Sequence, residues 1–324
     1  MSKKNASSCA CVILAAGEGK RMKSSLPKIA HLLGGRPLLA HVLDAAAAAG
    51  PSALLAVIPP RTPALEEILR GRAEAVIQDE KLGTGDALRR AAPRLRGLEG
   101  EVVVLCGDVP LIRPETVAGL LALHRERGWT ATVLGSVVDV PRGYGRIVRG
   151  EDGLVRKIVE DVEADAAQKD IREINSGIYC FSSPAVWDVL EKIGNRNRQG
   201  EYYLTDAVHL LVNSGAPVGI MSVPASEILG VNSRRQLAEA EKVFQARACA
   251  RLWENGVTVL CPETVYLEAG IEVGPDTVLG PFAAVETGAV IGRGCRLGPF
   301  VRVCAGEKIA DGAVRSGAPA NRGE

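Results

Sequence analysis

The sequence has 324 residues, of which 47% are hydrophobic and 24% charged, and its formal net charge is +1. This length suggests about two domains, and a net charge near zero indicates neither a nucleic-acid-binding protein nor a membrane-surface protein. The eight cysteines form no C-x-x-C pair, and the sequence contains neither a signal peptide nor a long apolar run. We therefore expect reduced thiols and a cytoplasmic protein.

The first two thirds of the chain alternate short apolar runs with longer helical patterns. A strand is expected at 10–15, followed by a helix at 36–50. The same pair recurs three times, at 53–59 with 63–71, at 74–78 with 83–95, and at 101–112 with 114–128. Later strands are expected at 130–138, 177–181 and 216–223, and later helices at 201–215 and 230–256. This alternation predicts an α/β fold with a Rossmann-like, mostly parallel sheet that is covered by helices on both faces.

The loop after the first strand is rich in glycine and positive charge. The stretch "VILAAGEGKRMKSSLPK" at 12–28 combines bare backbone N–H groups with four cations between Lys20 and Lys28. Its glycine spacing lacks the third glycine of a dinucleotide fingerprint and does not match the phosphate-loop pattern of nucleotide triphosphatases. Arg21 and Lys28 suit phosphate binding, because arginine makes paired contacts and lysine supplies a mobile charge. A solvated basic loop is the alternative.

Two oxygen-bearing side chains are expected where ligands bind in such sheets, beyond the carboxyl ends of the strands. Asp108 follows the apolar run that ends near Cys106, and Asn232 is expected where a strand ends and the last helix begins. Carboxylate and amide oxygens are natural ligands of Mg²⁺, which is held by few protein oxygens together with substrate phosphates. Asp108 could equally cap the following turn.

The pattern changes after Gly256, where apolar residues recur at every sixth position. They are Leu267, Val273, Leu279, Val285, Ile291, Leu297, Val303 and Ile309. A period of six predicts hexapeptide repeats of a parallel β-helix, in which each face of a three-sided coil takes one hexad. Eight positions make fewer than three coils, and an antiparallel hairpin is the alternative. The expected domains are 1–232, a linking helix at 233–256, a β-helix at 257–315 and a tail at 316–324.

Eight short motifs together carry a family resemblance. They are, in order, "LAAGEGKRM", "LPK", "LGTGDA", "GDVPL", "GYGRI", "EINSGIY", "QGEYYLTD" and "GVNSR". Over about residues 10–255 the chain resembles the uridylyltransferase domain of the bacterial N-acetylglucosamine-1-phosphate uridylyltransferase/glucosamine-1-phosphate acetyltransferase family. The tail is similar to the start of that family's left-handed β-helix. The first motif is shared by many sugar nucleotidyltransferases, whereas the combination of "GYGRI", "EINSGI" and "QGEYYLTD" is more specific.

The resemblance implies a nucleotidyltransferase that moves UMP from UTP to N-acetylglucosamine-1-phosphate with Mg²⁺ as cofactor. The product would be UDP-N-acetylglucosamine, a peptidoglycan precursor for cell wall biogenesis. Arg21 and Lys28 would act on the triphosphate, and Asp108 and Asn232 would hold the metal. The implied nucleotide-binding residues are Leu14, Ala15, Gly17, Gln78, Gly83 and Thr84. The implied sugar-binding residues are Gly145, Glu160, Asn175, Tyr203 and Thr205. Core packing is the alternative for Tyr203 and Thr205, and an exposed strand position is the alternative for Glu160.

The sequence departs from the family pattern at several points. Lys20 stands where the family usually has a small hydroxyl residue, and Cys106 stands where an aromatic residue is common. The last histidine is His209, so we expect the acetyltransferase activity to be absent, while a homotrimer is implied by the resemblance. Two other functions are considered: a nucleotidyltransferase for another sugar phosphate, such as glucose-1-phosphate with UTP or dTTP, and an inactive nucleotide-sensing subunit.

Overall fold

The computed structural model describes residues 8–317, which form two compact units. The larger unit contains residues 8–30 and 38–233, and the smaller one contains 31–37 and 234–317. The segment 31–37 belongs to the smaller unit although it lies within the range 1–232. Most of the expected tail at 316–324 lies outside the described residues.

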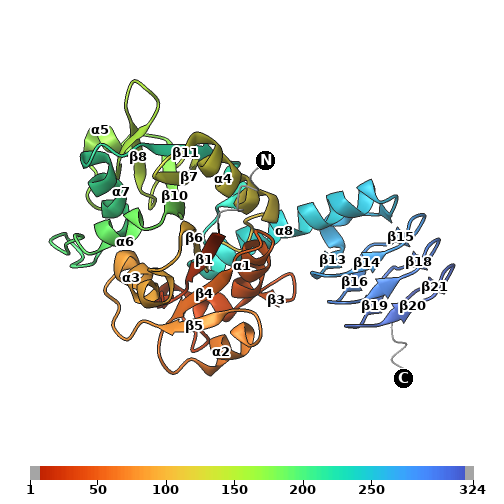
Figure 1. The fold of residues 1–324 in the computed structure, drawn as a ribbon. Helices are drawn as coiled ribbons and strands as arrows, with labels where there is room; N and C mark the ends of the chain where they lie inside the picture. Colours follow the sequence, from red (N-terminus) through yellow and green to blue (C-terminus); the bar gives the residue numbers. More distant parts are fainter. Residues whose placement is uncertain (1–7, 318–324) are drawn as a thin grey trace, which may run out of the picture. The chain divides into compact units, whose positions relative to one another are not determined.

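The larger unit is built on one nine-stranded sheet (Figure 1). Seven of its strands form the order β11-β7-β10-β6-β1-β4-β5. Their bounds are β1 Ser8–Leu14, β4 Ala53–Ile58, β5 Glu74–Ile77, β6 Gly100–Cys106, β7 Ala131–Val137, β10 Glu173–Ser182 and β11 Val218–Ser222. Strands β6, β1, β4 and β5 pair in parallel, whereas β10 runs antiparallel between β6 and β7. The prediction of a mostly parallel nucleotidyltransferase sheet is confirmed.

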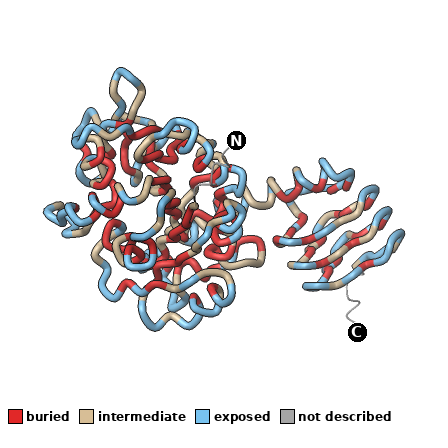
Figure 2. The backbone as a smooth tube through the Cα atoms, viewed as in Figure 1, coloured by how far each residue is buried: buried red, intermediate tan, exposed pale blue. Residues whose placement is uncertain are grey.

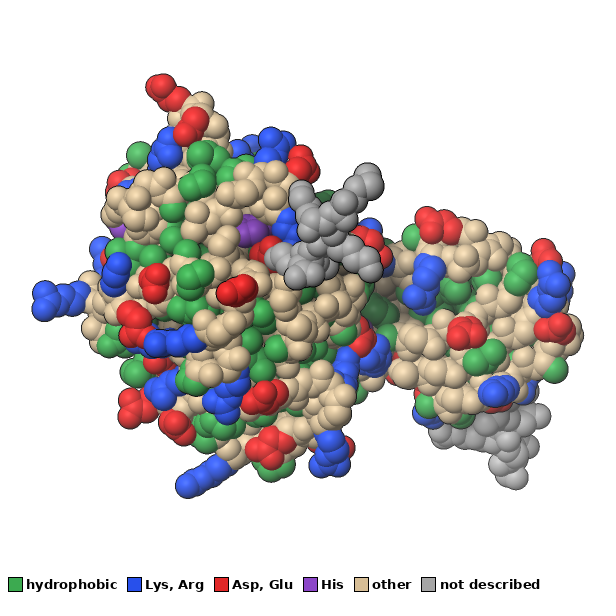
Figure 3. Space-filling model, in the orientation of Figure 1, with side chains coloured by type: hydrophobic (Ala, Val, Ile, Leu, Met, Phe, Trp, Pro, Cys, Tyr) green, Lys and Arg blue, Asp and Glu red, His purple; other side chains and the backbone are tan. Residues whose placement is uncertain are grey.

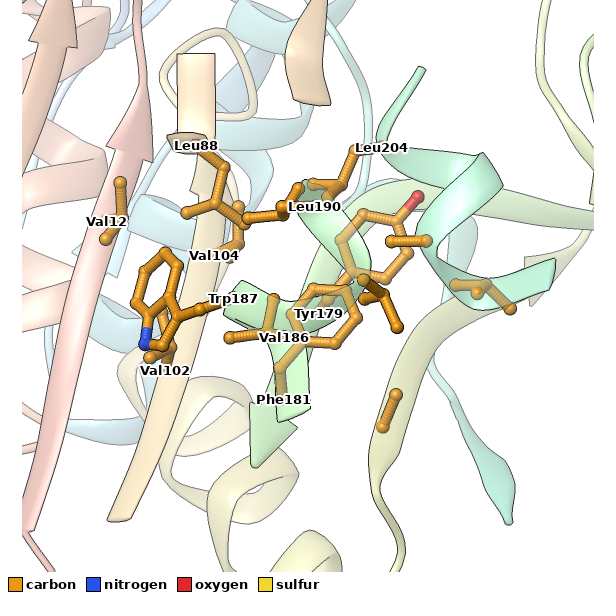
Figure 4. Close-up of a cluster of buried hydrophobic side chains, with 14 of the residues drawn as sticks. Val12, Leu88, Val102, Val104, Tyr179, Phe181, Val186, Trp187, Leu190 and Leu204 are labelled. Atoms are coloured by element: carbon orange, nitrogen blue, oxygen red, sulfur yellow. The ribbon is translucent and has the colours of Figure 1, made fainter. Parts of the chain in front are cut away.

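Helices cover both faces of this sheet because its central strands are apolar on both sides. Helices α3 (Thr84–Leu95), α6 (Ala185–Leu190) and α7 (Leu204–Asn213) pack on one face, and α1 (Leu38–Ala47), α2 (Pro63–Leu69) and α4 (Pro114–Arg127) pack on the other. Figure 4 shows the first of these cores, where Val12 and Val104 meet Leu88 and Trp187. The next residue of β1, Ile13, is buried in the opposite core. Figure 2 shows the buried residues running through the sheet.

Two features of the larger unit differ from the sequence analysis. Residues 146–159 form a hairpin of β8 (Arg146–Arg149) and β9 (Val155–Val159) that was not expected. The interpretation that Asn232 follows a strand is wrong, because β11 ends at Ser222. The chain then passes through the short helix η3 (Ala225–Glu227) and an irregular segment before helix α8 begins at Arg234. The apolar run at 228–231 is therefore a buried loop and not a strand, since Ile228 and Val231 are buried without strand pairing.

The smaller unit contains α8 (Arg234–Glu254) and a parallel β-helix of ten two-residue strands. The strands are β12 Thr258–Val259, β13 Tyr266–Leu267, β14 Glu272–Val273, β15 Val278–Leu279, β16 Ala284–Val285, β17 Val290–Ile291, β18 Arg296–Leu297, β19 Arg302–Val303, β20 Lys308–Ile309 and β21 Val314–Arg315. They stack into three sheets, β12-β15-β18-β21, β13-β16-β19 and β14-β17-β20. All of these pairs are parallel, so the β-helix is confirmed and the hairpin alternative is wrong.

The hexad residues form the interior of the β-helix. All of them are buried except Val273, which is half-buried against the same core. Tyr266 pairs with Ala284, eighteen positions later, so one coil uses three hexads. Successive coils approach closely at Gly280, where a Cβ atom would lie 3.2 Å from the Cα of Gly298. The ten strands complete three coils and begin a fourth. The sequence analysis expected fewer than three coils, because the eight hexad positions include neither Val259 nor the strand at 314–315.

Helix α8 covers the first coil of the β-helix. Its buried residues Ala248, Cys249 and Leu252 belong to the same core as Leu267. The side chain of Gln245 completes the edge of the first coil: its Nε2 donates to the carbonyl of Leu267 at 2.8 Å, and its Oε1 accepts from the N–H of Leu267 at 2.9 Å. An open strand edge is thereby paired with a side chain.

The surface charges, the cysteines and the helix lengths of the described residues add three observations. Figure 3 shows basic and acidic side chains interspersed on the visible face of the larger unit. All eight cysteines are free thiols. Within residues 8–317, no helix combines the length and apolar character that crossing a membrane requires. In sheets of this kind, ligands bind beyond the carboxyl ends of the parallel strands.

Candidate active site

A cavity of about 600 Å³ lies at the carboxyl ends of β1 and β6. Its volume is in the range of small-molecule sites. It is lined by the loop after β1, the segment leading into α3 and the residues after β6. Sixteen residues line it: Leu14, Ala15, Ala16, Gly17, Glu18, Lys20, Lys28, Ile29, Gln78, Lys81, Gly83, Thr84, Ala87, Cys106, Asp108 and Glu201. The six residues that the resemblance implies for the nucleotide are all among them.

A smaller cavity of about 190 Å³ adjoins the first. The two share Leu14, Thr84 and Cys106 as lining residues. The others that line the smaller cavity are Gly143, Tyr144, Gly145, Glu160, Asn175, Ser176, Gly177, Tyr179, Leu204 and Thr205. Four of the five implied sugar-binding residues are in this set. The fifth, Tyr203, is buried outside it and donates from its hydroxyl to Gln199 Oε1 at 2.8 Å.

Lys28 joins the two predicted metal ligands. Its side chain is buried, and its Nζ donates to Asp108 Oδ2 at 2.6 Å and to Asn232 Oδ1 at 2.8 Å. Asn232 reaches this point because the N–H of Val231 donates to the carbonyl of Asp108 at 2.8 Å. The two oxygens thus converge on a single cation. Such a donor pair fits Mg²⁺, which takes few protein oxygens when substrate phosphates supply the others.

Gly19 allows the stem of Lys28 to take this position. Its φ of +64° lies in the left-handed region, and a Cβ atom there would lie 2.5 Å from Lys28 Cβ. A residue with a side chain would be strained at this φ and would collide with the lysine stem. The glycines of the loop after β1 therefore position Lys28 as well as exposing backbone N–H groups.

Hydrogen bonds fix the side of the larger cavity near α3. Gln78 is buried, and its Nε2 donates to the carbonyl of Gly83 at 3.1 Å and to Asp86 Oδ2 at 2.9 Å. The φ of Gly83 is +102°, and a Cβ atom there would lie 2.7 Å from the carbonyl oxygen of Tyr202. The hydroxyl oxygen of Thr84 accepts from the N–H of Leu204 at 3.1 Å. These contacts tie the start of α3 to the segment before α7 and hold the amide of Gln78 in one orientation.

A register shift in β10 shapes the smaller cavity. The pairing of β10 with β7 slips between Asn175 and Ile178, and such a bulge re-aims the neighbouring side chains. Asn175 Nδ2 donates to the hydroxyl of Tyr179 at 2.7 Å, and Asn175 Oδ1 accepts from the N–H of Gly177 at 3.1 Å. Cys106 Sγ donates to the carbonyl of Gly177 at 3.3 Å. Burial, with a smaller contribution from Asp108, raises the pKa of Cys106 to about 12, so its thiol stays protonated at neutral pH.

The comparisons with known proteins agree with this geometry. Residues 11–191, more than half of the chain, match the model of the MobA-like NTP transferase domain. The chain belongs to the MobA-like NTP transferase family. Residues 270–305 also match the model of the bacterial transferase hexapeptide (six repeats). Most of the residues that line the two cavities lie within the matched NTP transferase domain, and the chain is a nucleotidyltransferase.

Several relatives are named "bifunctional protein GlmU". The chain is 46% identical to the one from Pelotomaculum thermopropionicum over 84% of this chain and 60% of that protein. It is 43% identical to the one from Geobacillus thermodenitrificans and 44% identical to the one from Acetivibrio thermocellus, each over 85% of this chain and 60% of the relative. The family resemblance is therefore confirmed. The chain spans about 60% of the length of these relatives.

Three of the predicted site residues, Arg21, Tyr203 and Asn232, line neither cavity, and several lining residues, Lys81 among them, were not predicted. Arg21 is exposed on the short helix η1 (Lys20–Met22) and lines neither cavity. Lys81 lines the larger cavity but was not singled out, because it carries no motif of its own. Glu18 pairs with Lys20 at 2.7 Å and with Lys81 at 2.6 Å. Hydrogen bonds from these lysines hold the pKa of Glu18 at about 2.

Glu160 combines burial with a position in the smaller cavity of the NTP transferase domain. It is half-buried directly after β9, and its Oε1 accepts from Thr205 Oγ1 at 3.0 Å. Burial is the main cause that raises its pKa above the usual value for a glutamate, although the Thr205 bond acts in the opposite direction. Ionised Glu160 therefore costs stability. The cost is absent below the pKa of the unfolded chain and fully present above the raised pKa of the folded state.

We expect Glu160→Gln to stabilise the protein at high pH and to have little effect at low pH. The amide keeps the acceptor for Thr205 but removes the buried charge. Thermal melts of both proteins at about pH 8 and about pH 4 test this, with a larger gain in Tm expected at the higher pH. An equal gain at both values would show that the titration of Glu160 does not limit stability.

Proposed function

We propose that this chain transfers UMP from UTP to N-acetylglucosamine-1-phosphate, giving UDP-N-acetylglucosamine and pyrophosphate. The observation that carries the proposal is the pair of adjoining cavities. The larger one combines backbone N–H groups with lysines, as a nucleoside triphosphate requires. The smaller one presents Glu160, Asn175 and Thr205, which are hydrogen-bonding partners for a hexose. The relatives named bifunctional protein GlmU support the same substrates.

The reaction requires no protein base, because the phosphate of the sugar substrate is already ionised at neutral pH. One of its oxygens attacks the α-phosphorus of UTP in line, the bond to the β-phosphate oxygen breaks, and pyrophosphate leaves. The chain contributes by holding the two substrates in the adjoining cavities and by offsetting the charge that gathers between them. Lys28 is buried in the lining of the larger cavity and donates a hydrogen bond to the carboxylate of Asp108 there.

Mg²⁺ held by Asp108 and Asn232 would neutralise the phosphates of the nucleotide. Lys28 now donates to both of these oxygens. Its ammonium group is thus near enough to contact the phosphates beside the metal. Arg21 stays a proposed phosphate contact, and its exposed side chain would have to turn toward the larger cavity when the nucleotide binds.

Release of pyrophosphate with UTP and different sugar phosphates tests this function. We expect N-acetylglucosamine-1-phosphate to exceed glucose-1-phosphate in kcat/KM by at least about a hundredfold. A site built to pair the polar groups of its substrate leaves those partners unpaired with an analogue that lacks them. Equal values would favour a nucleotidyltransferase for another sugar, with UTP or dTTP. No release with any pair would favour the nucleotide-sensing subunit. We place the enzyme in the cytoplasm, where its free thiols stay reduced.

We also propose that this chain forms a homotrimer through its β-helix and lacks acetyltransferase activity. Two stacked rings at one corner of the β-helix, Phe282 and Phe300, are 54% and 60% exposed, with their centroids 4.9 Å apart. Apolar surface of this kind is typical of an interface. No histidine of this chain follows His209. We expect light scattering to give the mass of a trimer, and no acetylation of glucosamine-1-phosphate. A monomer, or measurable acetyl transfer, would contradict the corresponding half.

A further inference from the structure

Arg146 is a buried cation beside the smaller cavity. It begins β8 with only 2% of its surface exposed. Its Nη2 donates to Asp161 Oδ1 at 2.9 Å, and its Nη1 donates to the carbonyl oxygen of Tyr144. Its Nε is buried without a hydrogen-bond partner among the described residues. Burying a guanidinium in this way is expensive, and an apolar residue of similar size often serves stability as well.

The partners of Arg146 hold residues that line the smaller cavity. Tyr144 itself lines the cavity from the loop before β8, and Asp161 directly follows the lining residue Glu160. Arg146 also pairs through its backbone with Ile174, the residue before Asn175. One side chain and its backbone thus connect three segments that come from different parts of the chain.

The backbone pairing of the hairpin β8–β9 with β10 is short, and Arg149 at the far end of β8 adds an ion pair with Glu173 on β10, at a point away from the smaller cavity. The pairing between β8 and β10 consists of Ile174 with Arg146. One further bond runs beside it, from the N–H of Asn175 to the carbonyl of Gly145 at 2.9 Å. The side-chain contacts of Arg146 therefore add a tie between the loop at 143–145 and the segment at 160–161. Neither Tyr144 nor Asp161 lines the larger cavity.

We propose that Arg146 is a positioning residue for the sugar phosphate. It holds Tyr144 and the segment of Glu160 at the separation that the hexose requires, and it has no such effect on the nucleotide. The proposal rests on the proposed function, because it assigns the smaller cavity to the sugar. A purely structural role predicts something different: lower stability, with no preference for one substrate.

Arg125 on helix α4 offers a control, because it pairs with Glu101 on strand β6 of the same sheet. Its Nε and Nη2 donate to the two carboxylate oxygens of Glu101 at 3.0 and 2.8 Å, and Glu101 is buried. Neither Arg125 nor Glu101 lines a cavity. This arginine also pairs with a carboxylate, but here the carboxylate is the buried partner and the arginine side chain is exposed, and the pair lies away from both cavities.

The test compares Arg146→Met with Arg125→Met. We expect Arg146→Met to raise the KM for N-acetylglucosamine-1-phosphate by at least about tenfold, since small displacements of positioning groups have effects of this size, while the KM for UTP changes less than about twofold. Arg125→Met is expected to lower Tm and to leave both KM values unchanged. An Arg146→Met enzyme whose two KM values rise equally, or that loses only Tm, overturns the proposal.

Two further variants serve if Arg146→Met does not fold. Asp161→Asn removes the charged partner from a half-buried position and is expected to raise the same KM, though by less. Arg146→Lys keeps the charge but cannot reach both partners, and it should fall between Arg146→Met and the wild type. If neither variant changes the KM for the sugar phosphate, the proposal is wrong. A wild-type enzyme that does not accept N-acetylglucosamine-1-phosphate would instead contradict the proposed function, and the sugar phosphate that it does accept would then be used.

Discussion

Lys28→Met is expected to lower kcat/KM for UTP by about a hundredfold or more. The methionine keeps the apolar stem that packs on Gly19 but removes the charge that Asp108 and Asn232 now contact. A charge-assisted contact is worth about 1.5–3 kcal/mol, and the ammonium group offers more than one to a triphosphate. Steady-state rates of pyrophosphate release measure the loss. Tm should change little, because the charge is held by the site and not by the hydrophobic core.

Arg21→Ala is the comparison for this experiment. Arg21 lies on the same loop as Lys28, but it is exposed and lines neither cavity. A loss as large as that of Lys28→Met would show that η1 closes on the nucleotide. A loss of less than about threefold would assign Arg21 to the solvated surface. If Lys28→Met itself retains wild-type rates, the basic loop does not bind the triphosphate.

Asp108→Ala is expected to abolish metal-dependent turnover while the protein stays folded. Asp108 is two residues beyond the end of β6, and its carboxylate contributes nothing to the two cores of the sheet. Without it, Asn232 alone remains to hold the ion, and the several kcal/mol of charge stabilisation that a metal supplies are lost. The rate should fall by at least about a hundredfold.

Binding of Mn²⁺ in the presence of UTP, followed by electron paramagnetic resonance, gives a readout that does not depend on turnover. Asp108→Ala should weaken this binding, and Asp188→Ala, a change at an exposed position of α6 that lines neither cavity, should not. Thermal melts of both variants check the fold. Wild-type Mn²⁺ affinity and wild-type rates in Asp108→Ala would remove the metal assignment.

Patterns of apolar residues in the sequence predict the β-helix and the central strands of the sheet. The hexads from Leu267 to Ile309 predict the β-helix because each coil repeats one buried position per face. The continuous apolar runs at 10–15 and 102–106 predict central strands because both of their faces are covered. The residues that the resemblance implies for the nucleotide, among them Gly17, Gln78 and Thr84, line one cavity in the structure.

Features that depend on contacts between distant segments, or on very short strands, could not be predicted from the sequence. Asn232 reaches Lys28 through a buried loop that is held by the backbone of Asp108, a contact between residues that are far apart in the chain. The strands β8 and β9 are only four and five residues long and mix apolar and charged residues without strict alternation, so their pattern does not distinguish a strand from a loop. The ion pairs of Glu18 with Lys20 and Lys81 depend on how two loops meet.

The eighteen-residue coil restricts how the length of the smaller unit can change. Val278 pairs with Arg296, so the two residues occupy equivalent positions of successive coils. A deletion of 278–295 would join Thr277 directly to Arg296, and Arg296 would then take the position that Val278 held. Removing a single hexad would instead rotate all later residues onto the neighbouring face of the triangle, and the glycine column at 280 and 298 would no longer align. We therefore expect the β-helix to tolerate the insertion or deletion of whole coils only. Each coil changes its length by about 4.8 Å along the axis, and a change by a fraction of a coil disrupts the stacking of the strands.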